Sequence, residues 1–305
     1  MKILLTGTTG QLGHTLLPLL SQHHEVIAPT RAELDLSDAV AIAAFVGDCK
    51  PDLIINPAAY TAVDKAETEL ALAHAINGVA PGVFAEQAKK LGIGLIHYST
   101  DYVYDGSLRL ANGDLVSYTE DAATNPLNVY GKTKLAGEQA IITSGCQYLI
   151  FRTSWVYSTF GKNFLLTMLR LANERDELRV VSDQWGAPTS ADSIASTTVD
   201  IVGQLCQSND AAQWWKAHQG IYHLTTKGRT SWCGFTEEIL RQATVSGRLK
   251  KTAPIVTGIP AIDYPTPAQR PVNSCLDTTR LVHAFGISVP TWEVALATCL
   301  APKQK

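Results

Sequence analysis

The sequence predicts an α/β fold: a doubly wound parallel sheet joined to a smaller C-terminal part. Short apolar runs alternate with stretches of helical pattern along the first half of the chain, and glycines directly follow the first run. Alternation of this kind is typical of βαβ units, whose strands lie parallel. After about residue 155 the alternation loosens. The runs that we interpret as strands lie near 2–6, 25–28, 52–56, 93–98 and 147–152.

The helical stretches between these strands carry start and stop signals. Ser37 is expected to cap the second helix, because its hydroxyl can accept a hydrogen bond from a free backbone N–H. Gly92 is expected to end the third helix, because glycine adopts the left-handed backbone conformation at little cost. The expected helices lie around 11–21, 38–47, 67–90 and 130–143.

Gly7, Gly10 and Gly13 follow the first predicted strand and lead into the first predicted helix. Glycine allows the backbone to approach a pyrophosphate closely, and the free N–H groups of the helix N-terminus stabilise its charge. The G-x-x-G-x-x-G spacing differs from the standard dinucleotide fingerprint, G-x-G-x-x-G. An ordinary glycine-rich turn is the alternative. The strand before the loop and the helix after it favour a nucleotide-binding loop.

Tyr130 and Lys134 are four residues apart in a predicted helix, so they share one face of it. A nearby ammonium lowers the pKa of a phenol, and such a tyrosine can donate a proton to the alkoxide formed in carbonyl reduction. The spacing alone is weak evidence, because most pairs of this kind lie on an exposed helix face.

Ser99 and Thr100 follow the strand predicted near 93–98. Ligands of open α/β sheets bind at the carboxyl ends of the strands, so one of these hydroxyls is expected to meet a substrate carbonyl. The alternative is an ordinary strand end, since turns also favour serine and threonine.

Taken together, these three features resemble the extended branch of the short-chain dehydrogenase/reductase superfamily, which modifies nucleotide sugars. Longer segments are similar to the dTDP-4-dehydrorhamnose reductase family, and the resemblance covers nearly the whole chain. Pro57 departs from the family pattern, in which a small residue is usual. The segments that carry the closer resemblance are 62–67, 97–103, 126–134, 151–157, 183–189 and 264–271.

The resemblance implies an NADPH-dependent enzyme that reduces the C4 ketone of dTDP-4-dehydro-L-rhamnose to dTDP-L-rhamnose. Tyr130 would donate the proton, Lys134 would hold the nicotinamide ribose and keep the pKa of Tyr130 low, and Thr100 would hydrogen-bond the carbonyl. Core packing is the alternative for Trp155, and Arg152 is expected to be structural. The positions implied to bind the substrate are Thr100, Asp101, Tyr102, Trp155 and Arg270.

The end of the second predicted strand bears on the choice of cofactor. A carboxylate there would bind the ribose 2′-OH of NAD, but the sequence has Arg31, whose guanidinium suits a 2′-phosphate. We therefore expect NADPH to be preferred and NADH to be tolerated; a solvated surface arginine is the alternative. The expected cofactor-binding residues are Gly7, Gly10, Gln11, Leu12, Gly13, Thr30, Arg31, Asp35, Leu36, Ala59, Tyr60, Thr61, Tyr130 and Lys134.

Composition limits the partners. A net charge of −3 without a Lys/Arg cluster argues against nucleic acid, and no apolar stretch approaches the ~20 residues that span a bilayer. The six scattered cysteines lack a C-x-x-C pair, which is typical of a reducing cytoplasm. The histidines show no metal-ligand spacing. Some relatives dimerise around Mg²⁺, but Thr15 and Asp192 at the matching positions make that site doubtful here.

The resemblance also implies how the chain is divided. Residues 1–155 would form the dinucleotide-binding Rossmann domain and 156–305 mainly the nucleotide-sugar-binding part, with later segments crossing back to the sheet. The polar end at 302–305 is expected to fray. Two other functions stay open: an epimerase of the same branch that keeps NAD bound, and a non-catalytic regulatory subunit on the same fold. The sequence does not distinguish a monomer from a homodimer.

Overall fold

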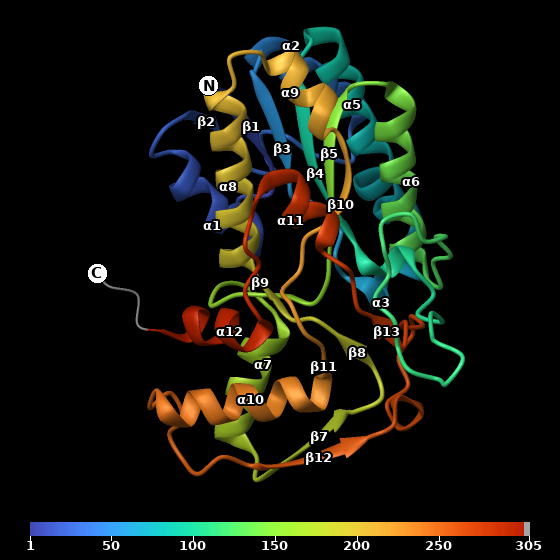
Figure 1. Ribbon diagram of the computed structural model, residues 1–305, viewed down its shortest axis with the longest axis vertical. Helices are drawn as coiled ribbons and strands as arrows, with labels where there is room; N and C mark the ends of the chain where they lie inside the picture. Colours follow the sequence, from blue (N-terminus) through green and yellow to red (C-terminus); the bar gives the residue numbers. More distant parts are fainter. Residues whose placement is uncertain (302–305) are drawn as a thin grey trace.

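A computed structural model of the protein describes residues 1–301, and the 302–305 segment expected to fray lies outside this part. Its centre is a six-stranded parallel sheet, which confirms the doubly wound α/β prediction (Figure 1). The sixth strand comes from late in the chain and was not predicted. In spatial order the strands are β10 (Gly220–His223), β5 (Gln147–Thr153), β4 (Gly94–Thr100), β3 (Leu53–Asn56), β1 (Lys2–Leu5) and β2 (Glu25–Ile27).

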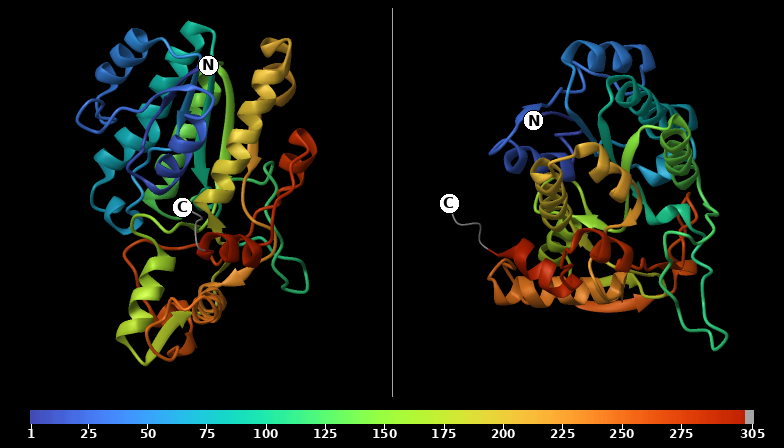
Figure 2. Two further views of the ribbon diagram at one scale, coloured as in Figure 1. Left: turned by 90° about the vertical axis from the view of Figure 1, so that its left-hand side faces the viewer. Right: turned by 45° about the horizontal axis from the view of Figure 1, so that its top comes forward.

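Helices cover both faces of this sheet, as the turned view in Figure 2 shows. Alternate side chains of β1 enter different cores: Ile3 and Leu5 pack on one face and Leu4 on the other. Burial of each such side chain stabilises the fold by about 1.5–3 kcal/mol. The first face packs against α1 (Gln11–Leu20), α8 (Ala191–Gln207), α9 (Ala211–His218) and α11 (Thr279–Phe285). The second packs against α2 (Ala39–Cys49), α5 (Ala80–Leu91) and α6 (Val129–Ser144).

Two details of the predicted helices are corrected. The single helix expected over 67–90 is three segments: α4 (Leu70–His74), the π-helical turn η1 (Ala75–Val79) and α5. The N-cap of α2 is Asp38, which accepts from the backbone N–H groups of the first turn, because Ser37 instead donates to Asp35. The stop at Gly92 is confirmed, with a left-handed φ of 70°.

The lower part of the molecule in Figure 1 is built around a separate hydrophobic cluster. The domain boundary predicted at residue 155 stays a prediction. Two elements that follow residue 155 in the chain, β10 and α8, belong to the central sheet and to the helices that cover it. The elements of the lower part are β6 (Val156–Tyr157), α7 (Phe164–Glu174), β7 (Glu177–Val181), β8 (Trp185–Gly186), β9 (Thr189–Ser190), β11 (Thr230–Ser231), α10 (Trp232–Val245), β12 (Ile255–Ile259), η3 (Ala261–Asp263), β13 (Asn273–Ser274) and α12 (Trp292–Leu300).

The order of the strands determines where a ligand can bind. From β1 the chain passes to β2 on one side and then to β3 on the other, so the connections diverge at the carboxyl ends of β1 and β3. Such a switch point opens a crevice in doubly wound sheets. The connections at this end include α3 (Val63–Ala66) and the 3₁₀ turn η2 (Asp101–Val103).

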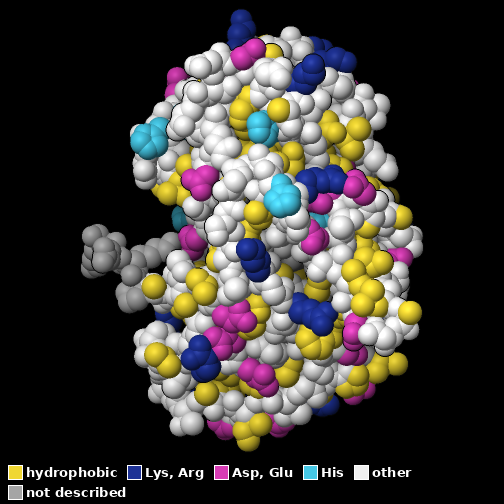
Figure 3. All heavy atoms as spheres, viewed as in Figure 1, with side chains coloured by type: hydrophobic (Ala, Val, Ile, Leu, Met, Phe, Trp, Pro, Cys, Tyr) yellow, Lys and Arg dark blue, Asp and Glu magenta, His cyan; other side chains and the backbone are white. Residues whose placement is uncertain are grey.

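The surface gives no sign of a large basic patch on the face shown in Figure 3, where Lys and Arg side chains lie among acidic and uncharged ones. Within residues 1–301, no helix combines the length and the apolar character needed to cross a bilayer.

Candidate active site

A cleft with a volume of about 430 Å³ lies at the switch point. Ser99 lines it, and so do most of the residues predicted to bind the cofactor. Tyr60 does not line the cleft: its phenol donates to Glu69 instead, at 2.6 Å. The predicted cofactor residues in the lining are Gly7, Gly10, Gln11, Leu12, Gly13, Thr30, Arg31, Asp35, Leu36, Ala59, Thr61, Tyr130 and Lys134.

The glycine loop requires its glycines. Gly7 has a left-handed φ of 64°, and a Cβ atom there would lie 2.8 Å from Cα of Ala58. A Cβ on Gly13 would lie 2.3 Å from the carbonyl oxygen of Gly7. Gly10 precedes α1 and has no side chain to cap it, so the first N–H groups of the helix are available to a diphosphate. The loop therefore fits a dinucleotide.

α6 places Tyr130 and Lys134 on the cleft. Asn128 caps this helix, accepting from the N–H of Gly131 at 2.8 Å. A Cβ on Gly131 would lie 2.2 Å from the carbonyl oxygen of Tyr102, so glycine lets the helix approach the η2 turn that follows β4. The amino group of Lys134 points away from solvent: its Nζ lies 2.6 Å from the carbonyl oxygen of Tyr98. Burial lowers the pKa of Lys134 to about 8, against the opposing charge of Glu138.

The electrostatics of Tyr130 differ from the expectation. Burial raises the pKa of Tyr130, the negative charge of Asp101 raises it further, and a hydrogen bond with Thr100 acts in the opposite direction. The prediction that Lys134 keeps this pKa low is wrong in this structure. The reason is that the phenol is surrounded by protein atoms that desolvate it, while Lys134 directs its polar atom to the β4 backbone.

Thr100 lies behind Tyr130 rather than in the lining of the cleft. Its hydroxyl donates to Oδ1 of Asp101 at 2.9 Å and accepts from the N–H of Tyr102 at 3.2 Å. Burial raises the pKa of Asp101 to about 6, although hydrogen bonds from Ser274 and Thr100 oppose the shift. The Thr100 proton is therefore directed to Asp101, and it must turn before it can reach a substrate oxygen.

The other predicted substrate residues lie on separate elements. Tyr102 meets the ring of Tyr130 edge to face, with centroids 5.6 Å apart. Trp155 has a strained φ of 48° and stacks on Trp232, with ring centroids 3.5 Å apart. This stacking supports the packing alternative for Trp155. Arg270 forms a salt bridge with Asp64 at 2.9 Å.

Two features of the site were missed in the sequence. Asn77, in the π-helical turn, binds both the N–H and the carbonyl oxygen of Tyr60, at 2.8 and 3.0 Å, and so fixes the loop after β3. Lys162 lines the cleft because its loop is tied to α1, where Oε1 of Gln11 accepts from Ser158 and Asn163. Both depend on contacts between distant segments, so no local pattern could reveal them.

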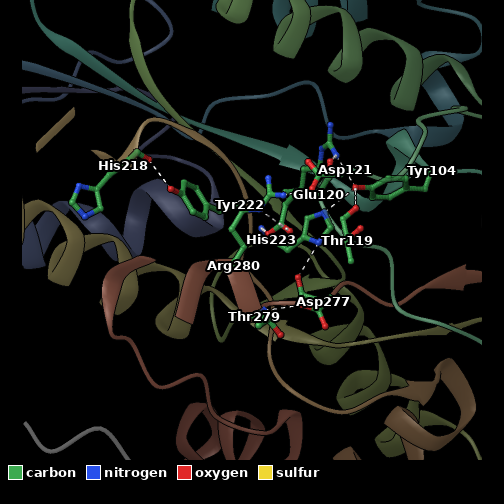
Figure 4. A network of polar contacts seen from close by, with 11 residues as sticks. Tyr104, Thr119, Glu120, Asp121, His218, Tyr222, His223, Asp277, Thr279 and Arg280 are labelled. Atoms are coloured by element: carbon green, nitrogen blue, oxygen red, sulfur yellow. Dashed lines mark hydrogen bonds and ion pairs between the residues drawn. The ribbon is translucent and has the colours of Figure 1, made fainter. Parts of the chain in front are cut away.

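A buried polar network connects α6 to the central sheet, and Figure 4 shows part of this network. Arg152 of β5 binds both carboxylate oxygens of Glu138, at 3.0 and 2.6 Å, and the hydroxyl of Tyr104 at 2.6 Å. The same hydroxyl lies 2.9 Å from Nε2 of His223 on β10. These contacts agree with the structural role expected of Arg152, because they join α6 to two strands.

The fold and the cleft define a dinucleotide-binding protein of the short-chain dehydrogenase/reductase type. The chain matches the family described as RmlD substrate binding domain over residues 1–305. It is 43% identical over 301 residues to the dTDP-4-dehydrorhamnose reductase of Burkholderia thailandensis, covering 98% of each chain. The protein belongs to this family of dTDP-4-dehydrorhamnose reductases.

Solved structures agree with this assignment. A dTDP-4-dehydrorhamnose reductase from Clostridium acetobutylicum has a TM-score of 0.86 and 35% identity, with 98% of each chain covered. The reductase from Bacillus anthracis, solved in complex with NADP, has a TM-score of 0.84 and 30% identity, again covering 98% of each chain.

Proposed function

We propose that this protein reduces the C4 ketone of dTDP-4-dehydro-L-rhamnose to dTDP-L-rhamnose with NADPH, the last step in making this nucleotide sugar. The observation that carries the proposal is a single cleft in which the glycine loop, Arg31, Ser99, Tyr130 and Lys134 come together in a chain of this family. The names of its relatives supply the substrate class.

Bound NADPH would supply the hydride that reaches the sugar carbonyl. Tyr130 would donate its proton to the oxygen as negative charge grows there. Its raised pKa suits this task, because the phenol keeps its proton until a stronger base, the alkoxide, forms beside it. Thr100 would stabilise the same oxygen after turning its hydroxyl away from Asp101. Lys134 would hold the ribose next to the nicotinamide.

Arg31 supports a preference for NADPH over NADH. It is exposed and lines the cleft beside Thr30, which is where the 2′-phosphate would lie. Glu33, the nearest acidic residue in sequence, accepts from both the N–H and the hydroxyl of Thr30, and so is engaged locally. The glycine loop serves both cofactors alike, so NADH is tolerated.

Magnesium stays doubtful: Thr15 has no carboxylate and donates to the carbonyl of Gln11.

The proposal includes a cytoplasmic protein whose partner is a dTDP-sugar, without a nucleic-acid or membrane partner, and either a monomer or a homodimer. The substrate residues proposed are Thr100, Asp101, Tyr102, Trp155 and Arg270. For the last of these, release from Asp64 would be needed before its guanidinium could bind a ligand.

The test is oxidation of NADPH by the purified protein with enzymatically made dTDP-4-dehydro-L-rhamnose, followed by identification of the product. Stoichiometric formation of dTDP-L-rhamnose is expected. Interconversion of sugars without net NADPH consumption, by protein that retains NAD through purification, would indicate an epimerase. Absence of turnover together with co-purification of a larger enzyme would indicate a regulatory subunit.

A further inference from the structure

Behind the cleft, a line of buried side chains ends on Lys134. Thr6 follows β1, Asn56 ends β3, His97 lies in β4 and Lys134 in α6, and each is at most 2% exposed. Oγ1 of Thr6 lies 2.6 Å from Oδ1 of Asn56, and Nδ2 of Asn56 lies 3.2 Å from Nδ1 of His97. Nε2 of His97 lies 3.2 Å from Nζ of Lys134. The sequence alone predicts no role for Thr6, Asn56 or His97.

The distances define the direction of these hydrogen bonds. A separation of 2.6 Å suits a hydroxyl donating to an oxygen, whereas 3.2 Å suits a longer contact between nitrogens. Thr6 also accepts from the N–H of Ala58 at 3.3 Å, so its own proton is free to go to Asn56. The amide nitrogen of Asn56 therefore donates toward His97.

This direction corresponds to one tautomer of His97. Burial lowers the pKa of His97 well below its usual value, so the ring is neutral and carries one proton. When Nδ1 accepts from the side-chain amide of Asn56, the proton is on Nε2, facing Lys134, whereas a proton on Nδ1 can go to the backbone carbonyl of Asn56, a contact that raises the pKa of His97. An ammonium group has three donors and no acceptor, so it cannot receive the N–H of Nε2. The arrangement fits the neutral amine of Lys134, which accepts from His97 and donates to the carbonyl oxygen of Tyr98.

The ammonium form of Lys134 needs the hydrogen bonds of this line to run in the opposite direction. Nε2 of His97 must then accept, so the ring proton moves to Nδ1, and Asn56 must turn its amide so that the oxygen faces His97. The nitrogen of the amide would then donate to Thr6, whose hydroxyl oxygen can accept it. In this second order the Thr6 hydroxyl accepts from both the Asn56 amide and the N–H of Ala58, and its own proton loses the acceptor it has on Asn56.

We propose that His97 and Asn56 are positioning residues that couple the charge of Lys134 to the tautomer of His97. The amine goes with a proton on Nε2, and the ammonium with a proton on Nδ1. The change from the first state to the second is the uptake of one proton from solvent: Lys134 gains one positive charge, and the imidazole stays neutral with its single proton on the other nitrogen. The importance of this coupling for catalysis rests on the proposed function, but its existence does not.

Other ionisable groups near Lys134 influence the pH at which Lys134 changes its charge. Glu138, one turn further along α6, favours the ammonium, and Arg152 of β5 binds that carboxylate. Tyr130 lies on the same face of α6 as Lys134, and the negative charge of Asp101 in η2 raises the pKa of Tyr130. Burial is the largest influence on Lys134 and lowers its pKa to about 8, so the change falls within a pH range in which it can be measured.

The first test is nuclear magnetic resonance of the ¹⁵N-labelled full chain, which reports which ring nitrogen of His97 carries the proton. The variant His97→Gln identifies the signals. Between pH 6 and 10 the proton is expected to pass from Nδ1 to Nε2 with a midpoint near the pKa of Lys134, about 8. A single tautomer throughout this range in folded protein would overturn the proposal.

Asn56→Asp provides the second test, because a carboxylate only accepts hydrogen bonds. It should hold the proton on Nδ1, and by favouring the ammonium it should move the midpoint upward by about 1 pH unit or more. Ile96→Val, a buried change next to His97 on β4, should leave the wild-type midpoint in place. An unchanged midpoint in a folded Asn56→Asp protein would contradict the coupling.

The pH dependence of kcat/KM for NADPH oxidation should shift in the same direction in Asn56→Asp. The spectroscopic titration needs no substrate. A wild-type protein that shows the change of tautomer but does not reduce the keto sugar would therefore refute the proposed function and leave this inference standing.

Discussion

Replacing Asp101 by asparagine should stabilise the protein above about pH 6 and impair its activity. Asp101 is 2% exposed, and burial raises the pKa of its carboxyl to about 6. A carboxyl whose pKa is higher in the folded than in the unfolded chain contributes its stability at low pH and loses it as the pH rises through the folded value. Ionised Asp101 is therefore a cost to folding at neutral pH.

The magnitude follows from the difference between the two pKa values. An unfolded aspartate has a pKa of about 3.9, so the shift is about 2 units, or roughly 3 kcal/mol once both forms are ionised. About half of this cost is already present at pH 5, so the advantage of Asp101→Asn should grow by about 1.5 kcal/mol between pH 5 and 8. Asparagine keeps an oxygen to accept from Thr100, so the local fold should survive.

Urea unfolding of both proteins at several pH values measures this difference. Comparing the change with pH, rather than the absolute difference, removes any constant effect of the new amide group. Asp101→Glu serves as a control that keeps the titrating group. A difference in unfolding free energy that is independent of pH would refute the reasoning, because it would show that Asp101 does not titrate with a raised pKa in the folded protein.

Three further changes test the proposed reaction. Tyr130→Phe should lower kcat by about 10²–10⁴-fold with cofactor binding largely kept, and turnover within a few-fold of wild type would exclude Tyr130 as the acid. Thr100→Val should cost about 2–4 kcal/mol of transition-state stabilisation. A larger loss from Ser99→Ala would show that the serine, which lines the cleft, is the residue that meets the carbonyl. Arg31→Ala should remove the preference for NADPH while leaving kcat/KM for NADH nearly unchanged; an equal loss for both cofactors would rule out a phosphate-binding role.

Features encoded by local pattern were predictable from the sequence. The strands that carry the glycine loop and the strand-end hydroxyls are buried on both faces, so they appear as continuous apolar runs bounded by turn residues. Helical periodicity predicts that Tyr130 and Lys134 share a helix face, and the other two motifs were needed to identify them as site residues. The glycines of the loop after β1 could be recognised because the backbone there leaves no room for a Cβ atom.

Features that depend on distant contacts were not predictable. β10 is four residues long and enters the sheet beside β5 after a long excursion through the lower part of the molecule. The π-helical turn that interrupts the predicted third helix contains Asn77, whose side chain satisfies the backbone of Tyr60. Such a bulge is recognisable only when the loop that it binds is in place.

The pKa values of the site also depend on distant contacts. This is why the sequence pointed to Tyr130 and Lys134 but predicted the wrong direction for the pKa of Tyr130. Spacing on a helix predicted that an ammonium would lower the pKa of Tyr130. Burial instead raises the pKa of Tyr130 and lowers that of Lys134, so both shifts favour the uncharged forms. Uncharged groups avoid the desolvation cost of an ion in the interior. With a pKa of about 8, Lys134 is still mostly an ammonium at pH 7, so its charge can stabilise the phenolate that forms when the substrate oxygen takes the phenolic proton.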